Sequence, residues 1–441
     1  MNKKNVMLTK TELSVAMIAI MLIAIFTVSF MVQIGVSANV DSYGIYSTVH
    51  PGNEPCLIKL APDGTEILRI SQEQLGLDWG LGAIEVKINK VDGTFWFWRA
   101  GYPSIVAHLS ADTEEILASW TVSSWIKRLT IDSDGGVWLS GGYDPYTFKY
   151  SADGALIAKI TSSSYPSWPH WCGWVSVNFA EQTVWLTASW NTVVKLNPDG
   201  SEILTISGFY NPGTGISVDQ TDGSVWVADQ FNNEVVKLDT NGNELVRVNV
   251  GSLPYFVLAN PVDGGVWVVF DYATEGPMKR LDSSGNVIAT SEILFTDHWV
   301  LEFDIAPDGT VWVSEYAANK IHKISPNGEL LLTVGGDPAT FWRPAWISIF
   351  PEPTIPEAVQ ILIEDVEEMN LQQGLENSID SKLQNVQDSL EALNADNRND
   401  AINKLDAFIN AIEAQRDNKI SNEQADYLIA EAQRIINLID A

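Results

Sequence analysis

The stretch Asp222-Gly223-Ser224-Val225-Trp226-Val227 is followed by a polar loop, then by Val236-Lys237-Leu238, an Asn241-Gly242 turn and the aliphatic pair Leu245-Val246. The same order of turn, tryptophan strand, lysine strand, turn and aliphatic strand returns along most of the chain. A small unit that recurs at a fixed spacing is the sequence signature of a repeat architecture, in which each unit stacks on its neighbours. The repeat therefore decides the fold.

The spacing of the repeat indicates propeller blades. Its marker tryptophans are separated by 42, 47, 41, 41 and 45 residues, and a blade of four strands takes about 40–45 residues. The glycine-containing turns supply the positive φ that tight hairpins need. A turn follows the lysine strand seven times, whereas the marker tryptophan occurs six times. The markers are Trp96, Trp138, Trp185, Trp226, Trp267 and Trp312.

A blade shared between the two ends of the array explains why seven turns accompany only six marker tryptophans. The first unit, 43–71, has outer strands without an inner strand before them, and Trp346-Ile347-Ser348-Ile349 is an inner strand with no outer strands after it. Joining them predicts a mainly β fold, a seven-bladed β-propeller over 43–350 with roughly 44 residues per blade. Closure removes the two sheet edges that an open array would expose.

An uncharged segment near the N-terminus predicts export. Residues 13–40 carry no charge and follow a basic region, 1–12, which is expected to stay cytoplasmic. A bilayer needs about 20 apolar residues, so 13–38 predicts a transmembrane anchor. Val36-Ser37-Ala38 also looks like a signal-peptide cleavage site. Both readings place the rest of the chain on the outer side of the membrane or in the extracellular medium.

The composition and the hydrophobic periodicity of the chain change after a proline-rich linker, 351–356. Residues 357–441 carry apolar stripes at helical spacing, such as Leu383, Val386 and Leu390, and predict a small α-helical bundle of three or four helices. Ser421 with Gln424 predicts a capping box at the start of the last helix.

The tail resembles the helical module called FIMAH, found at the C-terminus of exported prokaryotic proteins. The likeness rests on residues 407–412 and 420–425. It implies attachment to a partner or to the cell surface more than any activity.

Composition excludes one class of function. The formal net charge of −30 argues against nucleic-acid binding, which needs a basic surface. No histidine spacing is typical of a metal site, so no metal site and no cofactor are predicted, although an acidic channel could attract a divalent cation. His108 and His322 are expected at the surface, because they are assigned to the strand position that is usually lysine.

The propeller repeats are similar to NHL-type repeats and to streptogramin lyases of the virginiamycin B lyase family. The likeness is carried by 311–316, 319–321 and 324–328 and spans most of 43–350. It implies a metal-assisted lyase, or a hydrolase, with a histidine base fourteen residues before a glutamate. Glu315 fits the glutamate, but Leu301 occupies the base position and His298 lies three residues earlier. The acid–base pair is not reproduced, which leaves His298 and Glu315 as catalytic candidates only.

One face of the predicted propeller is rich in aromatic residues. Loops that enter the inner strands and loops that leave the tryptophan strands share one mouth of the central channel, where a ligand is expected to bind. Rings backed by carboxylates are suited to stacking on sugars or aromatic ligands. The candidates are Trp79, Trp125, Trp171, Tyr210, Tyr255, Trp299 and Trp342 in the entering loops, and Trp190, Asp229, Tyr272 and Tyr316 in the others.

The leading prediction is an exported cell-surface protein that binds an extracellular ligand or protein at this mouth without catalysis. The alternatives are a metal-assisted lyase or hydrolase and a purely structural surface component.

Overall fold

The computed structural model describes most of the chain beyond residue 42. It covers 43–351 apart from 50–54, 78–83, 91, 100, 112–114, 142–145, 162–171, 189–190, 213–214, 252, 271–275, 294–299, 338–340 and 342. It also covers 358–440 apart from 361, 364–365, 367–368, 370, 372, 391–394 and 417. The predicted basic region 1–12 and apolar segment 13–38 lie outside the described residues. Among the helices that are described, none has the length and apolar character needed to cross a membrane.

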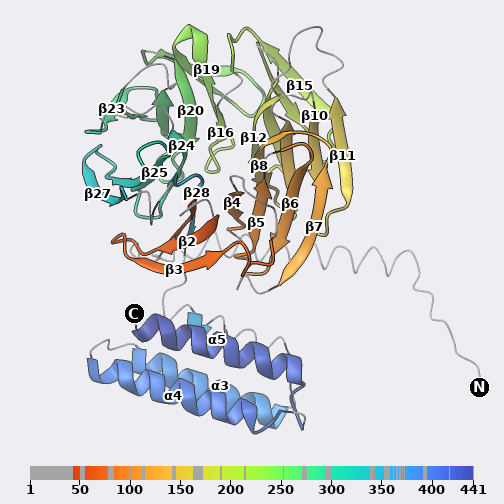
Figure 1. The fold of residues 1–441 in the computed structure, drawn as a ribbon, viewed down its shortest axis with the longest axis vertical. Coiled ribbons are helices and arrows are strands. Elements are labelled where there is room, and N and C mark those ends of the chain that lie inside the picture. The colour runs from red at the N-terminus through yellow and green to blue at the C-terminus, as the bar shows by residue number, and fades with distance from the viewer. Residues whose placement is uncertain are drawn as a thin grey trace, which may run out of the picture. The chain divides into compact units, whose positions relative to one another are not determined.

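The described strands form seven four-stranded antiparallel sheets, the blades of a propeller (Figure 1). Six blades use consecutive strands, and the innermost strand comes first in each. They are β4 (Ile84–Ile88), β5 (Phe95–Arg99), β6 (Ser104–Leu109) and β7 (Ile116–Val122); β8 (Ile126–Ile131), β9 (Val137–Gly141), β10 (Tyr146–Tyr150) and β11 (Leu156–Thr161); β12 (Cys172–Asn178), β13 (Thr183–Ala188), β14 (Thr192–Leu196) and β15 (Glu202–Ser207); β16 (Ile216–Val218), β17 (Val225–Asp229), β18 (Glu234–Leu238) and β19 (Glu244–Asn249); β20 (Pro254–Ala259), β21 (Val266–Phe270), β22 (Lys279–Leu281) and β23 (Val287–Thr290); and β24 (Val300–Ile305), β25 (Val311–Glu315), β26 (Lys320–Ile324) and β27 (Leu330–Gly335).

The seventh blade joins the two ends of the repeat array. Its strand order is β28 (Ile347–Pro351), β1 (Tyr43–Val49), β2 (Cys56–Leu60) and β3 (Glu66–Ser71). Tyr43 pairs with Pro351, and Ser47 pairs with Ile347. The predicted closure by strands from both ends is therefore confirmed. Tyr46 stands where the other blades have their marker tryptophan.

A basic side chain faces every marker ring from the third strand of the blade. The cross-strand pairs are Tyr46 with Lys59, Trp96 with His108, Trp138 with Lys149, Trp185 with Lys195, Trp226 with Lys237, Trp267 with Arg280, and Trp312 with Lys323. The five lysine ammonium groups lie 5.2–5.8 Å from the ring centroids, which is cation–π distance. All six tryptophans are fully buried.

This arrangement corrects the expectation for two histidines. His108 and His322 are both buried. His108 lies opposite a marker ring, inside the blade, and His322 lies between the side chains of Glu315 and Thr333. The His108 imidazole stacks on Trp96 at 4.1 Å. His322 lies one residue before the lysine position, which Lys323 occupies, and it pairs instead with Val313.

Neighbouring blades are linked at the channel by side chains, since their inner strands do not pair with one another. The Ser217 hydroxyl accepts the backbone N–H of Ala259 in the next blade at 2.9 Å. The Ser348 hydroxyl of the closing strand likewise accepts the N–H of Ile88 at 3.1 Å, which ties the last blade to the first. These bonds satisfy backbone groups that would otherwise be buried without a partner.

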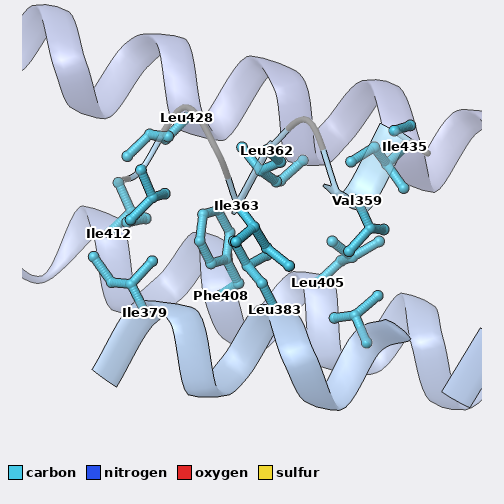
Figure 2. Close-up of a cluster of buried hydrophobic side chains, with 14 of the residues drawn as sticks. Val359, Leu362, Ile363, Ile379, Leu383, Leu405, Phe408, Ile412, Leu428 and Ile435 are labelled. Carbon is cyan, nitrogen blue, oxygen red and sulfur yellow. The ribbon is translucent and has the colours of Figure 1, made fainter. Parts of the chain in front are cut away.

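The helical tail has a core of its own. Its described helices with defined ends are α3 (Gln373–Leu390), α4 (Ala395–Glu413) and α5 (Asn422–Asp440), and residues 358–360, 362–363 and 366 are also helical. Figure 2 shows side chains of all these segments meeting in one cluster, with Phe408 among them. Ser421 and Gln424 make the two reciprocal capping bonds, each 3.2 Å long. The predicted capping box is confirmed.

If the closing strand holds the ring together, shortening one of its buried side chains should destabilise the whole propeller. Ile347 is fully buried, and an Ile347→Ala variant is expected to lose about 2–5 kcal/mol of the free energy of unfolding. Denaturant titration followed by tryptophan fluorescence measures this loss. The matched control is Ile288→Ala on β23, where the side chain is half exposed and the expected loss is below about 1 kcal/mol. Equal losses would contradict a central role for the closing strand.

Candidate functional site

The inner strands surround a cavity of about 140 Å³ on the propeller axis. Every blade contributes a lining residue, either from its inner strand or, for Trp346, from the residue just before it. The lining combines indole and phenyl rings, the hydroxyls of Thr130, Ser176 and Ser217, and three charged side chains. A cavity of this size is large enough for several water molecules or for one small molecule.

Arg128 is the central side chain of this cavity. Its guanidinium carbon lies 3.8 Å from the Trp174 ring centroid and 3.9 Å from that of Trp346, so two indole rings pack against one cation. The Phe256 ring follows at 5.2 Å. Arg128 is only 6% exposed. Stacking on aromatic faces is favourable for a planar and weakly hydrated cation, and these contacts join blades that are far apart in the sequence.

A carboxylate compensates this buried charge. Glu302 accepts Arg128 Nη1 at 3.4 Å through one oxygen and Lys87 Nζ at 3.2 Å through the other. Burial lowers the pKa of Arg128, and the nearby carboxylates of Glu302 and Glu85 act in the opposite direction. Ion pairs withdrawn from water need such mutual compensation. We call Arg128, Trp174, Trp346, Phe256 and Glu302 the axial cluster.

Sequence analysis did not identify the three charged residues of the cavity as part of a site. Arg128, Glu302 and Lys87 lie on the inner strands β8, β24 and β4. Other inner strands carry small hydroxyl residues between apolar ones, as in Ile216-Ser217-Val218. A charged residue within such a buried strand is the signal that could have found them, since an unpaired charge is not tolerated there.

Tyr210 and Phe231 form an exposed aromatic pair at the mouth. Tyr210 precedes β16, and Phe231 follows β17, in the 3₁₀ turn η3 (Gln230–Asn232). Their rings meet edge to face with centroids 5.2 Å apart. Tyr210 is 53% exposed and Phe231 38% exposed. Sequence analysis identified the mouth position of Tyr210.

Asp229 lies beneath this pair. It is fully buried, and its carboxylate accepts the Tyr210 backbone N–H at 2.6 Å, Asn232 Nδ2 at 2.9 Å and Arg247 Nη1 at 3.2 Å. The predicted ligand-binding carboxylate thus holds the mouth loops from below.

The other described candidates occupy different positions around the mouth. Trp125 is exposed just before β8. Tyr255 is half-buried and packs edge to face on Phe256 of the axial cluster at 4.5 Å. Tyr316 is half-buried with the Arg343 guanidinium 5.3 Å from its ring centroid. Trp79, Trp171, Trp190, Trp299, Trp342, Tyr272 and the catalytic candidate His298 lie outside the described residues.

The carboxylate of Glu315 contacts His322 inside the protein. It is buried at the end of β25, and its Oε2 lies 3.0 Å from Nε2 of His322. The other nitrogen of that imidazole lies 2.9 Å from the Thr333 hydroxyl on the outer strand β27. Within the described ranges, no group of three or more His, Cys, Asp or Glu side chains is placed to hold a metal ion.

Comparison with solved structures finds propellers. A protein described as functionally unknown from Desulfotomaculum acetoxidans aligns with a TM-score of 0.55 and 14% identity, covering 70% of this chain and 99% of that one. A streptogramin B lyase aligns with a TM-score of 0.49 and 16% identity, covering 60% and 87%. Virginiamycin B lyase from Staphylococcus aureus aligns with a TM-score of 0.46 and 16% identity, covering 58% and 84%.

These identities show the fold alone. Streptogramin lyases, which the propeller repeats resemble, are thus among the solved structures similar to this chain. No family model matches the chain, and no curated protein matches it. The FIMAH resemblance of the tail stays a prediction.

The axial cluster predicts a strong effect of removing its cation. Arg128→Ala is expected to lower the free energy of unfolding by about 3–5 kcal/mol, because Glu302 loses one of its two partners and the indole rings lose their cation. Denaturant titration provides the measurement.

The matched test removes both charges. In Arg128→Met combined with Glu302→Gln, the carboxylate that pairs with Arg128 is removed together with the cation, and more than half of the lost stability should return. A double variant as unstable as the sum of the single variants would contradict the coupling between the two charges.

Proposed function

We propose that this chain is an exported, noncatalytic binding protein whose propeller recognises an extracellular ligand or protein at its aromatic mouth. The proposal rests on one observation. Among the described propeller residues, the exposed aromatic side chains are Tyr102, Trp125, Phe179, Tyr210 and Phe231, and four of these five lie at the mouth. Phe179, which follows the inner strand β12, lies on the opposite face.

Exposed rings on one face are the expected mark of a binding surface. Aromatic rings offer a large contact area with few rotatable bonds, so ordering them on binding costs little conformational entropy. Isolated exposed apolar residues need no explanation, but exposed rings that share one face of the propeller do. The binding surface comprises the loops before the inner strands and after the second strands.

The charged groups near the channel support binding over chemistry. The Arg128 guanidinium is compensated within the axial cluster, and Glu315 is held by His322. A general base must be within reach of a proton on the substrate, whereas Glu315 and the His322 imidazole that contacts it are both buried.

The site of action follows from the N-terminal sequence. Residues 13–38 either remain as an anchor in the cell membrane or are removed on secretion, and both outcomes expose the mouth to the extracellular medium. The acidic chain is suited to a soluble surface there.

The binding face is tested by replacing its rings. The full-length protein is immobilised and screened against oligosaccharides, peptidoglycan fragments and purified extracellular proteins by biolayer interferometry. A variant with Tyr102→Ser, Trp125→Ser and Tyr210→Ser is expected to lose at least about tenfold in affinity for any ligand found, a change of about 1.4 kcal/mol in binding free energy.

The control is Phe179→Ser, which removes an exposed ring from the opposite face. It should bind as the unsubstituted protein does. Equal binding by the triple variant, or equal loss in the control, would show that the mouth is not the binding surface.

A further inference from the structure

We propose that Tyr210 and Phe231 form a stacking subsite for the ring of a neutral sugar. This inference rests on the proposed binding function and names the ligand class for one part of the mouth. It is argued from how the two rings are exposed, how they are held, and which polar groups surround them.

The two rings are presented as an open platform. Tyr210 is the more exposed of the pair, and Phe231 meets it edge to face at an interplanar angle of 67°. One ring is therefore supported at its edge by the other. An open platform covers only one side of a ligand. A sugar suits this geometry, because its C–H face can lie on the ring while its hydroxyls stay in water or bond to the rim.

The platform is held rigidly. The Tyr210 N–H donates to Asp229 at 2.6 Å, and the Tyr210 carbonyl accepts the N–H of Phe231 at 3.0 Å. Phe209, the preceding residue, is buried in the cluster around Trp185 and Val227. Both backbone groups of Tyr210 are thus fixed by the turn that carries its partner ring. A surface ordered before binding loses little entropy when a ligand arrives.

Amide side chains border the platform. Asn211 Nδ2 donates to Gln230 Oε1 beside the two rings, and Asn232 donates to Asp229 from the same turn. Carboxamides present both donors and acceptors, the combination that sugar hydroxyls require. The rings supply the stacking surface, and the accessible carboxamides of Asn211 and Asn232 supply orientation, whereas Gln230 is buried and holds Asn211 in place.

The nearby cation is already engaged. Arg247 pairs with Asp229 at 3.2 Å and with Glu234 and Glu244 at 2.8 Å each. Hydrogen bonds that Arg247 donates to Glu244, with a further one to Glu234, raise the pKa of Arg247. Three carboxylates around one guanidinium leave a local excess of negative charge, which disfavours an acidic sugar. The structure therefore favours a neutral ligand over a uronic acid or a sulfated sugar.

The test uses the full-length protein and isothermal titration calorimetry. The probes are neutral hexasaccharides of glucose, xylose, mannose and N-acetylglucosamine, with hexagalacturonate as the acidic counterpart. At least one neutral probe is expected to bind, and Tyr210→Ala is expected to weaken it at least about tenfold. Tyr210→Trp keeps a stacking face and should retain the affinity.

The matched control is Tyr427→Ala, which removes an equally accessible tyrosine from α5. It should leave the affinity unchanged. Circular dichroism and the melting temperature of each variant establish that the fold persists, and Tyr210→Trp distinguishes a lost platform from a disturbed loop.

Three results would overturn the inference: no neutral probe binds, Tyr210→Ala binds as tightly as the unsubstituted protein, or hexagalacturonate is preferred. If a protein or an acidic ligand binds and its affinity falls in the triple mouth variant, the saccharide subsite is wrong and the mouth remains the binding surface. If that variant binds every ligand normally, both proposals fail.

Discussion

The contact between a marker ring and the basic side chain opposite it is the interaction on which each blade depends. A lysine buried at this position would be costly if it stood alone. In the second blade, Lys149 lies over Trp138 and pairs with Asp132 at 2.9 Å. Asp132 in turn accepts the indole N–H of Trp138 at 2.6 Å. Ring, cation and carboxylate thus satisfy one another and join the second strand of the blade to the third.

A cation, aromatic rings and a carboxylate also meet on the propeller axis, where the arrangement occurs once and is not part of the repeat. Arg128 meets Trp174 and Trp346 from different blades, and Glu302 compensates its charge. The cross-strand pairing of a marker ring with a basic residue is local and recurs in all seven blades, whereas the axial cluster occurs once and joins distant parts of the chain. The repeat therefore stabilises each blade, and the features that distinguish this propeller lie outside the repeat, at the axis and at the mouth.

The architecture could be predicted because its determinants are local. Tryptophans, turn glycines and strand alternation recur within each unit, and counting them was enough to predict the shared blade. Tyr46 shows the limit of this method, since a tyrosine fills the tryptophan position in the closing blade. His322 shows another, because a shift of one residue along β26 moves a side chain to the other face of the strand.

The site was harder to predict for a physical reason. The partners of Arg128 come from blades that are separated by dozens of residues or more, so no local spacing connects them. Tyr210 was found because loop positions follow from the repeat. The role of Asp229 beneath it was not, since burial at the end of a strand depends on how the neighbouring loop folds over it.

The antiparallel pairing of Tyr43 with Pro351 brings the two ends of the propeller domain together. The two residues mark the points where the polypeptide enters and leaves the toroid, and they are adjacent. The second strand begins, and the inner strand finishes, at the rim away from the aromatic rings. Both ends of the toroid therefore lie on the face opposite the exposed aromatic rings of the mouth.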